Sequence, residues 1–214
     1  MTSDLRDIYR RLLRRFGPQH WWPGQTRFEI IIGAILTQNT NWSNVEKAIA
    51  NLKKAGVLTA DKLHAVDIKK LAELIRPAGY YNIKAARLKS FLDWLFENYA
   101  GKLKNLKDVP TDRLRRELLG VKGIGPETAD SILLYAFERP VFVVDAYTAR
   151  IAARHHLIDE GAGYDEIKDF FESHLPAEVA LFNEYHALLV RLGKEFCRPT
   201  PRCDRCPLNH LPHL

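Results

Sequence analysis

The sequence predicts an all-α protein, and three observations support that prediction. Apolar residues recur three and four positions apart along nearly the whole chain of 214 residues. Glycine and proline interrupt this pattern at intervals that suit turns between helices. Only Pro140–Val144 has the composition of a strand, and a single short strand has no partner with which to pair.

The helical pattern can be followed from one end of the chain to the other. In the first half it marks four amphipathic segments, which are Leu5–Leu13, Phe28–Leu36, Val45–Leu52 and Leu88–Phe96. In the second half it predicts helices around Thr111–Leu119, Pro126–Phe137, Ala146–His156, Tyr164–His174 and Ala177–Lys194. The segment from Arg198 onward is rich in proline, cysteine and histidine, so we expect a loop there.

Composition and charge narrow the class of protein. Hydrophobic residues make up 46% and charged residues 27% of the chain, as in ordinary globular proteins. The net charge of +6 favours a polyanionic partner such as nucleic acid, although a solvated basic surface is the simpler alternative. Met1–Arg15 lacks the apolar core of a secretory signal, and the longest apolar run, Ile30–Leu36, is too short to cross a membrane. We therefore expect a cytoplasmic protein with no membrane partner.

The stretch Leu118–Asp130 is the most informative part of the sequence. One helix ends, two glycines flank a single isoleucine, and a second helix begins at Pro126. Gly123 and Gly125 can take positive φ angles and let a phosphate approach the backbone, while Ile124 anchors the turn in the core. The first N–H groups of the second helix suit an anion. The alternative is an ordinary turn between helices, because such turns often contain glycine.

The run Gly120–Arg150 resembles the hairpin, the Gly/Pro-rich loop and the aspartate of the endonuclease III-like, helix-hairpin-helix (HhH-GPD) DNA glycosylases. Ile35–Thr40, Gly79–Ala85 and His186–Cys206 are similar to further segments of that family, in the family's order. The resemblance implies a monomer with two helical lobes flanking a DNA-binding cleft. Residues 23–137 would form a barrel lobe with the hairpin, and residues 1–22 plus 138–214 would form the other lobe.

The same resemblance implies the partner and the DNA contacts. The partner would be double-stranded DNA containing a damaged base, which must leave the base stack before it is excised. Gly123, Ile124, Gly125 and Thr128 would contact the DNA backbone. Gln38 would fill the gap left by the flipped base, although by position alone it is a polar residue at the end of a helix.

Asp145 is the candidate catalytic residue. A carboxylate near the sugar stabilises the positive charge that develops when an N-glycosidic bond breaks, and it can orient water. Aspartate is also a favoured N-cap, and Asp145 would cap the helix that begins at Ala146. Position alone favours the cap, whereas the family resemblance favours catalysis, and the two roles are compatible.

One departure from the family bears on the mechanism. The bifunctional members carry a lysine in the second hairpin helix that forms a Schiff base with the sugar, and Glu127 stands at the matching position here. Lys122 lies inside the hairpin loop and does not match. Because a carboxylate cannot form an imine, we expect a monofunctional glycosylase without AP-lyase activity.

Three tryptophans suggest which base is removed. Trp21, Trp22 and Trp42 lie on either side of the helix that leads to Gln38, and a positively charged methylated purine stacks well on indole. Their surroundings are similar to those in the 3-methyladenine DNA glycosylase III subgroup. We therefore expect an alkylated purine such as 3-methyladenine, bound between Trp42 and the Trp21/Trp22 pair. The alternatives are packing residues in the core, an endonuclease III-like enzyme for oxidised or mismatched pyrimidines, and a non-catalytic DNA-binding module.

Cys197, Cys203 and Cys206 all lie in the last eighteen residues. The endonuclease III pattern holds a 4Fe–4S cluster with four cysteines in such a loop, and Pro212 stands about where the fourth would fall. His210 and His213 flank that position, and we expect a histidine or an external ligand as the fourth ligand. We expect a cluster that folds the loop and directs Arg198, Arg202 and Arg205 at DNA phosphates. A zinc site or three free thiols are the alternatives.

Overall fold

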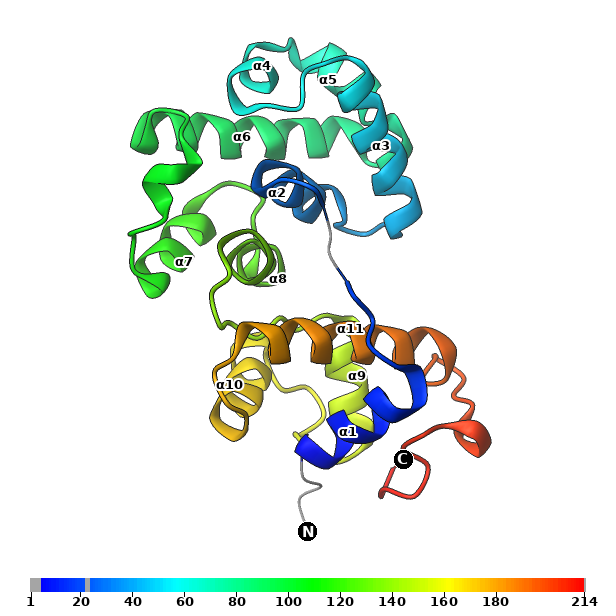
Figure 1. Ribbon diagram of the computed structural model, residues 1–214. Helices are drawn as coiled ribbons and strands as arrows, with labels where there is room; N and C mark the ends of the chain where they lie inside the picture. Colours follow the sequence, from blue (N-terminus) through cyan, green and yellow to red (C-terminus); the bar gives the residue numbers. More distant parts are fainter. Residues whose placement is uncertain (1–4, 22–23, 214) are drawn as a thin grey trace. The chain divides into compact units, whose positions relative to one another are not determined.

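The computed structural model describes residues 5–21 and 24–213, and every regular element in that part of the chain is helical (Figure 1). The predicted all-α class is therefore confirmed. The chain divides into two compact units, one of residues 22–138 and the other of residues 1–21 and 139–214. The boundaries expected from the sequence lie one residue from each of these divisions. None of the helices in the described ranges is long and apolar enough to cross a membrane.

The unit of residues 22–138 is built around the long helix α6 (Tyr81–Tyr99). Helices α4 (Ala60–Ala65) and α5 (Ile68–Leu74) lie along one side of α6, and α2 (Arg27–Leu36) lies on the other (Figure 1). The unit also contains α3 (Trp42–Lys54), α7 (Thr111–Gly120), α8 (Pro126–Ser131), and the single-turn elements η1 (Arg76–Ala78) and η2 (Leu103–Leu106).

Side-chain caps fix where four of these helices begin. The side chains of Thr26, Asn41, Thr59 and Asp67 accept hydrogen bonds from backbone N–H groups in the first turns of α2, α3, α4 and α5. Periodicity did not predict α4 and α5, because a helix of six or seven residues offers too few apolar positions for a repeat to show. Their caps, Thr59 and Asp67, were the signal available in the sequence.

A buried lysine holds the end of α2 to the start of α6. Lys84 is 1% exposed, and its Nζ donates to the carbonyl oxygens of Leu36 at 2.8 Å and Ala78 at 2.7 Å. These bonds satisfy two carbonyl groups that their own helices leave without a partner. Burial, with a smaller contribution from the charge of Arg87, lowers the pKa of Lys84 to about 8.

The Lys84 pKa predicts how stability depends on pH. Between pH 8 and about 10.4, the ordinary lysine pKa, the unfolded chain binds more protons at Lys84 than the folded chain. The free energy of unfolding therefore rises with pH across this window, by up to about 3 kcal/mol from this group. Urea unfolding at several pH values should show that the free energy of unfolding of wild type increases with pH relative to that of Lys84→Met. Lys69→Met, at an exposed lysine of α5, controls for the lost charge, and parallel pH curves for wild type and Lys84→Met would contradict the prediction.

The second helix of the hairpin changes its winding part-way along. A single α-helix was expected over Pro126–Phe137, but α8 ends at Ser131 and a π-helical turn, η3 (Ile132–Ala136), follows. All five residues of η3 are buried, and η3 packs against α2. A π turn inside a helix shifts the positions of the side chains that follow it. The three- and four-residue spacing of apolar residues in the sequence does not reveal such a shift.

The unit of residues 1–21 and 139–214 is built on α11 (Val179–Glu195), which packs against α1 (Leu5–Phe16) and α9 (Ala146–Arg154). Helix α10 (Tyr164–His174) joins them through an aromatic core. The Phe142 ring stacks on Phe171 with centroids 4.3 Å apart, and Tyr185 meets both rings edge-on. The Tyr185 hydroxyl donates to the Leu5 carbonyl at 2.9 Å and thereby ties α1 to α11.

Helices α9 and α11 approach each other closely at Gly193. A Cβ atom added at Gly193 would lie 2.3 Å from Cδ1 and 2.8 Å from Cβ of Tyr147. Tyr147 is the second residue of α9, immediately after the first helical residue. Because Gly193 has no side chain, α11 can approach the start of α9 this closely.

The residues from Pro140 to Val144 form no regular secondary structure. Side chains of α10 replace the missing strand partner: the Phe142 N–H donates to Glu172 Oε1 at 2.7 Å, and the Val144 N–H to the Tyr164 hydroxyl at 3.4 Å. Buried backbone N–H groups need partners, and here they find them without a sheet. This segment leads directly into Asp145.

Candidate functional site

Asp145 is fixed by contacts to both of its carboxylate oxygens. It is the N-cap of α9, and its Oδ1 accepts hydrogen bonds from the Thr148 N–H at 2.7 Å and the Thr148 hydroxyl at 3.0 Å. Its Oδ2 lies 3.7 Å from Nε2 of His186, which is ion-pair range but longer than an ordinary hydrogen bond. The side chain is only 13% exposed.

The surroundings keep this carboxylate ionised. Burial alone raises the pKa of Asp145, but the His186 imidazole and the hydrogen bonds from Thr148 outweigh burial and hold that pKa below its usual value. An ionised carboxylate with little access to water interacts strongly with positive charge placed beside it. Asp145 can therefore stabilise a cation and is not suited to donating a proton at neutral pH.

An aromatic pair adjoins the carboxylate. The Trp21 indole stacks on the His186 ring with centroids 5.4 Å apart and an interplanar angle of 19°. His186 lies on α11 and is 5% exposed, whereas Trp21 is partly exposed. The indole therefore contacts the same imidazole that faces Asp145, and all three residues belong to one unit. Periodicity did not single out His186, because it occupies an apolar position of α11 beside Ala187 and Leu188.

The hairpin of residues 121–125 joins α7 to α8. Gly123 has φ +91°, as predicted, and a Cβ added there would lie 2.3 Å from Cγ of Arg87. Gly125 has φ −95° and ψ 178°, so it does not use the positive φ that a glycine can take. Gly125 serves instead as the extended N-cap of α8, a conformation open to any residue. Ile124 is 5% exposed and anchors the turn.

Buried polar contacts brace the hairpin. Arg115 on α7 donates to both carboxylate oxygens of Asp130 on α8, at 2.7 and 3.1 Å, and Asp130 is fully buried. Such a bidentate pair fixes the angle between two helices as well as their separation. Thr128 is 6% exposed, so its side chain faces the protein interior.

Gln38 is engaged with the hairpin. Its Nε2 donates to the Gly123 carbonyl at 3.0 Å and to the Thr128 hydroxyl at 2.9 Å, and its Oε1 accepts a hydrogen bond from Arg87. The structure therefore brings together three of the predicted DNA-contacting residues within one unit. Filling a gap in DNA would require Gln38 to exchange these bonds for contacts with the duplex, so that role stays a prediction.

The three tryptophans cannot be treated as one group. Trp21 belongs to the unit that contains Asp145, and Trp42, the first residue of α3, belongs to the unit that contains the hairpin. Trp22 lies outside the described residues. A base held between Trp42 and the Trp21/Trp22 pair therefore also stays a prediction.

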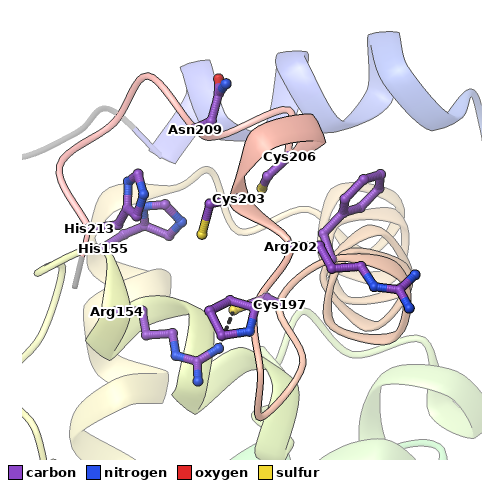
Figure 2. A pocket seen from close by; sticks show the side chains of 10 residues that line it. Arg154, His155, Cys197, Arg202, Cys203, Cys206, Asn209 and His213 are labelled. Atoms are coloured by element: carbon purple, nitrogen blue, oxygen red, sulfur yellow. Dashed lines mark hydrogen bonds between the residues drawn. The ribbon is translucent and has the colours of Figure 1, made fainter.

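The cysteine loop closes around one pocket. Cys197 follows α11, Cys203 begins the short turn η4 (Cys203–Arg205), and Cys206 follows that turn. All three thiols line the pocket, together with His155 and His213 (Figure 2). His210 does not line it, so of the two histidines suggested by the sequence only His213 is close.

The donors in this pocket are those of a metal site, although no three His, Cys, Asp or Glu side chains within the described ranges are close enough together to hold one metal ion. Burial raises the pKa of the Cys206 thiol, and the neighbouring Cys197 and Cys203 raise it further. Three thiolates here would need a compensating positive charge. The donor set fits a metal cluster with thiolate ligands.

Comparison with known families identifies the chain. The family model of the HhH-GPD superfamily of base excision DNA repair proteins matches residues 32–177, which include the hairpin and Asp145. The chain belongs to the HhH-GPD superfamily. The resemblance seen in the sequence is thereby confirmed.

Relatives of this HhH-GPD protein extend over most of its length. A protein of Methanocaldococcus jannaschii, provisionally described as a DNA repair glycosylase, is 54% identical over 205 residues, which are 95% of this chain and 93% of the relative. Endonuclease III of Sulfolobus acidocaldarius is 30% identical over 190 residues, covering 86% of this chain and 81% of its own.

Two solved structures are similar to the whole fold. The 3-methyladenine DNA glycosylase of H. pylori, bound to 1,N6-ethenoadenine, matches with a TM-score of 0.79 and 32% identity over 90% of this chain and 98% of its own. A trapped covalent intermediate of endonuclease III with DNA matches with a TM-score of 0.84 and 25% identity over 99% of this chain and 96% of its own. The HhH-GPD chain is accordingly a DNA glycosylase of base excision repair, with DNA as its substrate.

Proposed function

We propose that the protein is a monofunctional DNA glycosylase that removes an alkylated purine, 3-methyladenine first, with Asp145 as its catalytic residue. The observation that carries the proposal is the ionised, rigidly held Asp145 carboxylate with an indole stacked one ring away. A carboxylate and an electron-rich aromatic face suit a substrate that is cationic in its base and becomes cationic in its sugar.

Asp145 acts on the sugar. As the N-glycosidic bond lengthens, positive charge grows on the sugar ring, and the fixed carboxylate stabilises that charge without having to reorganise. Its Oδ1 is occupied by two hydrogen bonds from Thr148, which leaves Oδ2, the oxygen facing His186, as the atom that interacts with the sugar or with the attacking water. The products are a free base and an intact abasic site.

Hydrolysis rather than lyase chemistry is supported by the absence of a suitable lysine in the hairpin. Glu127, the second residue of α8, is exposed and cannot form an imine. The buried Lys84 is no substitute, because its ammonium group is held by two carbonyl oxygens.

DNA would be gripped through its backbone at the hairpin. The exposed glycines Gly123 and Gly125 let a phosphate come close to the main chain, and Thr128 lies in the first turn of α8, where backbone N–H groups are available to an anion. Gln38 contacts both sides of this turn, so DNA binding and the conformation of Gln38 should be coupled.

We also propose that Cys197, Cys203 and Cys206 hold a 4Fe–4S cluster. The cluster would cross-link the C-terminal loop and present the exposed Arg198, Arg202 and Arg205 to DNA. It would supply structure and take no part in breaking the glycosidic bond.

A lesion panel tests the proposed substrate and reaction. Base release should be measured from DNA treated with a methylating agent and from duplexes containing uracil, thymine glycol or 8-oxoguanine. We expect release of 3-methyladenine, a strand that breaks only after alkali treatment, and no protein–DNA adduct after borohydride reduction.

Trp21→Ala should slow release of the cationic base by up to roughly 30-fold, since cation–π stacking contributes up to about 2 kcal/mol.

Three outcomes would separate the alternatives. Release of oxidised or mismatched pyrimidines alone would replace the alkylated-purine assignment with an endonuclease III-like specificity. A stable borohydride adduct would replace hydrolysis with lyase chemistry. Binding of damaged DNA with no base released from any duplex would make the protein a DNA-binding module.

A further inference from the structure

We propose that His155 is the fourth ligand of the cluster held by Cys197, Cys203 and Cys206. The sequence offers no fourth cysteine, and Pro212, at the expected place, has no side-chain donor. The imidazole of His155 enters the same pocket from α9, far from the cysteine loop in the sequence (Figure 2).

The hydrogen bond made by His155 fixes its tautomer. Nδ1 lies 3.1 Å from the carbonyl oxygen of Pro212, and a carbonyl oxygen can only accept. Nδ1 must therefore carry the hydrogen, which leaves the lone pair on Nε2 free for a metal. Metal-bound histidines commonly donate their second ring nitrogen to a backbone carbonyl in this way. Pro212 thus contributes its backbone to orienting the ligand that replaces a cysteine.

Burial distinguishes His155 from His210 and His213, the two histidines of the cysteine loop. His155 is 7% exposed, close to the values of 7% for Cys197 and 9% for Cys206. His213 is exposed, and its ring lies 5.7 Å from that of His155, measured between centroids. His210 is exposed and does not line the pocket. His155 therefore shares the low solvent access of two of the cysteines, as suits a ligand inside the apolar shell of a metal site.

Arginines of α9 complete the surroundings of the thiols. Arg154 Nη1 lies 3.4 Å from Cys197 Sγ, and the same guanidinium donates to the carbonyls of Arg198 at 2.6 Å and Pro199 at 2.9 Å. Arg150 Nε donates to the Cys197 carbonyl at 2.8 Å. These bonds fix the first part of the loop against α9 and place positive charge beside a sulfur ligand, as thiolate clusters require.

The test compares four forms of the full chain, which are wild type, His155→Ala, His155→Cys and His213→Ala. Each is purified without oxygen and reconstituted with ferric iron and sulfide in the presence of a thiol reductant, and a sample is then reduced with dithionite to make the cluster paramagnetic. Iron, sulfide and zinc are measured, and ¹⁴N coupling is sought by pulsed EPR of the paramagnetic cluster. We expect wild type and His213→Ala to hold a cluster with one strongly coupled nitrogen. His155→Ala should lose that coupling and several-fold of its iron, and His155→Cys should keep the iron and lose the coupling.

Several results would overturn the assignment: nitrogen coupling that survives in both His155 variants, coupling lost in His213→Ala, a wild-type protein that binds zinc in place of iron, or one that binds neither. Circular dichroism of each variant shows whether the helices remain, and His155→Cys keeps the test decisive if His155→Ala does not fold. Base release is not the readout, so failure here leaves the proposed glycosylase activity untouched.

Discussion

Asp145→Asn should slow base release by about 10²–10³-fold, the usual effect of removing one group that stabilises charge in a transition state. The replacement keeps the shape of the side chain and its ability to cap α9, because asparagine is as good an N-cap as aspartate. The variant should therefore melt close to wild type and still bind damaged DNA. Single-turnover rates on methylated DNA, together with melting temperatures, measure both properties.

Two companion measurements make this result specific. Asp145→Ala should lose both the activity and the cap, with a loss of about 0.5–2 kcal/mol of stability. Because the pKa of Asp145 lies below its usual value, the ratio of wild-type to Asp145→Asn rates should begin to fall only at a lower pH than an ordinary aspartate would give. An Asp145→Asn enzyme within tenfold of wild type would remove this residue from the mechanism.

Gly193→Ala is expected to destabilise the unit of residues 1–21 and 139–214 by about 1–3 kcal/mol, the usual cost of forcing extra atoms into a packed interface. The new methyl group would overlap the ring and Cβ of Tyr147, so the backbone of α9 has to move. Since Tyr147 is the second residue of the helix that Asp145 caps, base release should fall as well. Thermal unfolding should show a melting temperature lower by roughly 3–10 °C.

Gly120→Ala is the matched control for this substitution. Gly120 is the last residue of α7, and a Cβ atom there would meet nothing within 4 Å. Alanine at such a position is neutral or stabilises by up to about 1 kcal/mol, because it restricts the unfolded chain. Equal effects of the two substitutions would mean that the contact between Gly193 and Tyr147 does not determine the packing of α9.

Much of the fold could be predicted because it follows from local rules. Helix α10 occupies the predicted residues, and Asp145, Gly123 and Ile124 have the predicted local conformations, because caps, positive φ angles and apolar anchors are properties of a few neighbouring residues. The π turn at Ile132–Ala136 was missed, since it lies in a buried segment packed against α2 and does not follow from a pattern of neighbouring residues.

The contacts of the candidate site were harder to predict than its residues. His186 contacts Asp145 and His155 enters the cysteine pocket, and each is separated in sequence from the residues it meets. Gln38 was recognised as important, yet its bonds to Gly123 and Thr128 depend on how α2 lies against the hairpin. Residue type and spacing indicate which chemistry is present, whereas tertiary packing decides which groups meet.

Helix α9 has one further consequence. Its N-cap is Asp145 and its C-cap is His155, so nine helical residues, a rod of about 14 Å, separate the carboxylate from the cysteine pocket. Because both ends belong to one short helix, a displacement of α9 at the cysteine pocket would also move its N-terminus. Whatever occupies the cysteine pocket would therefore set the position of the carboxylate mechanically, and a centre that takes no part in the chemistry could still govern the rate of base excision.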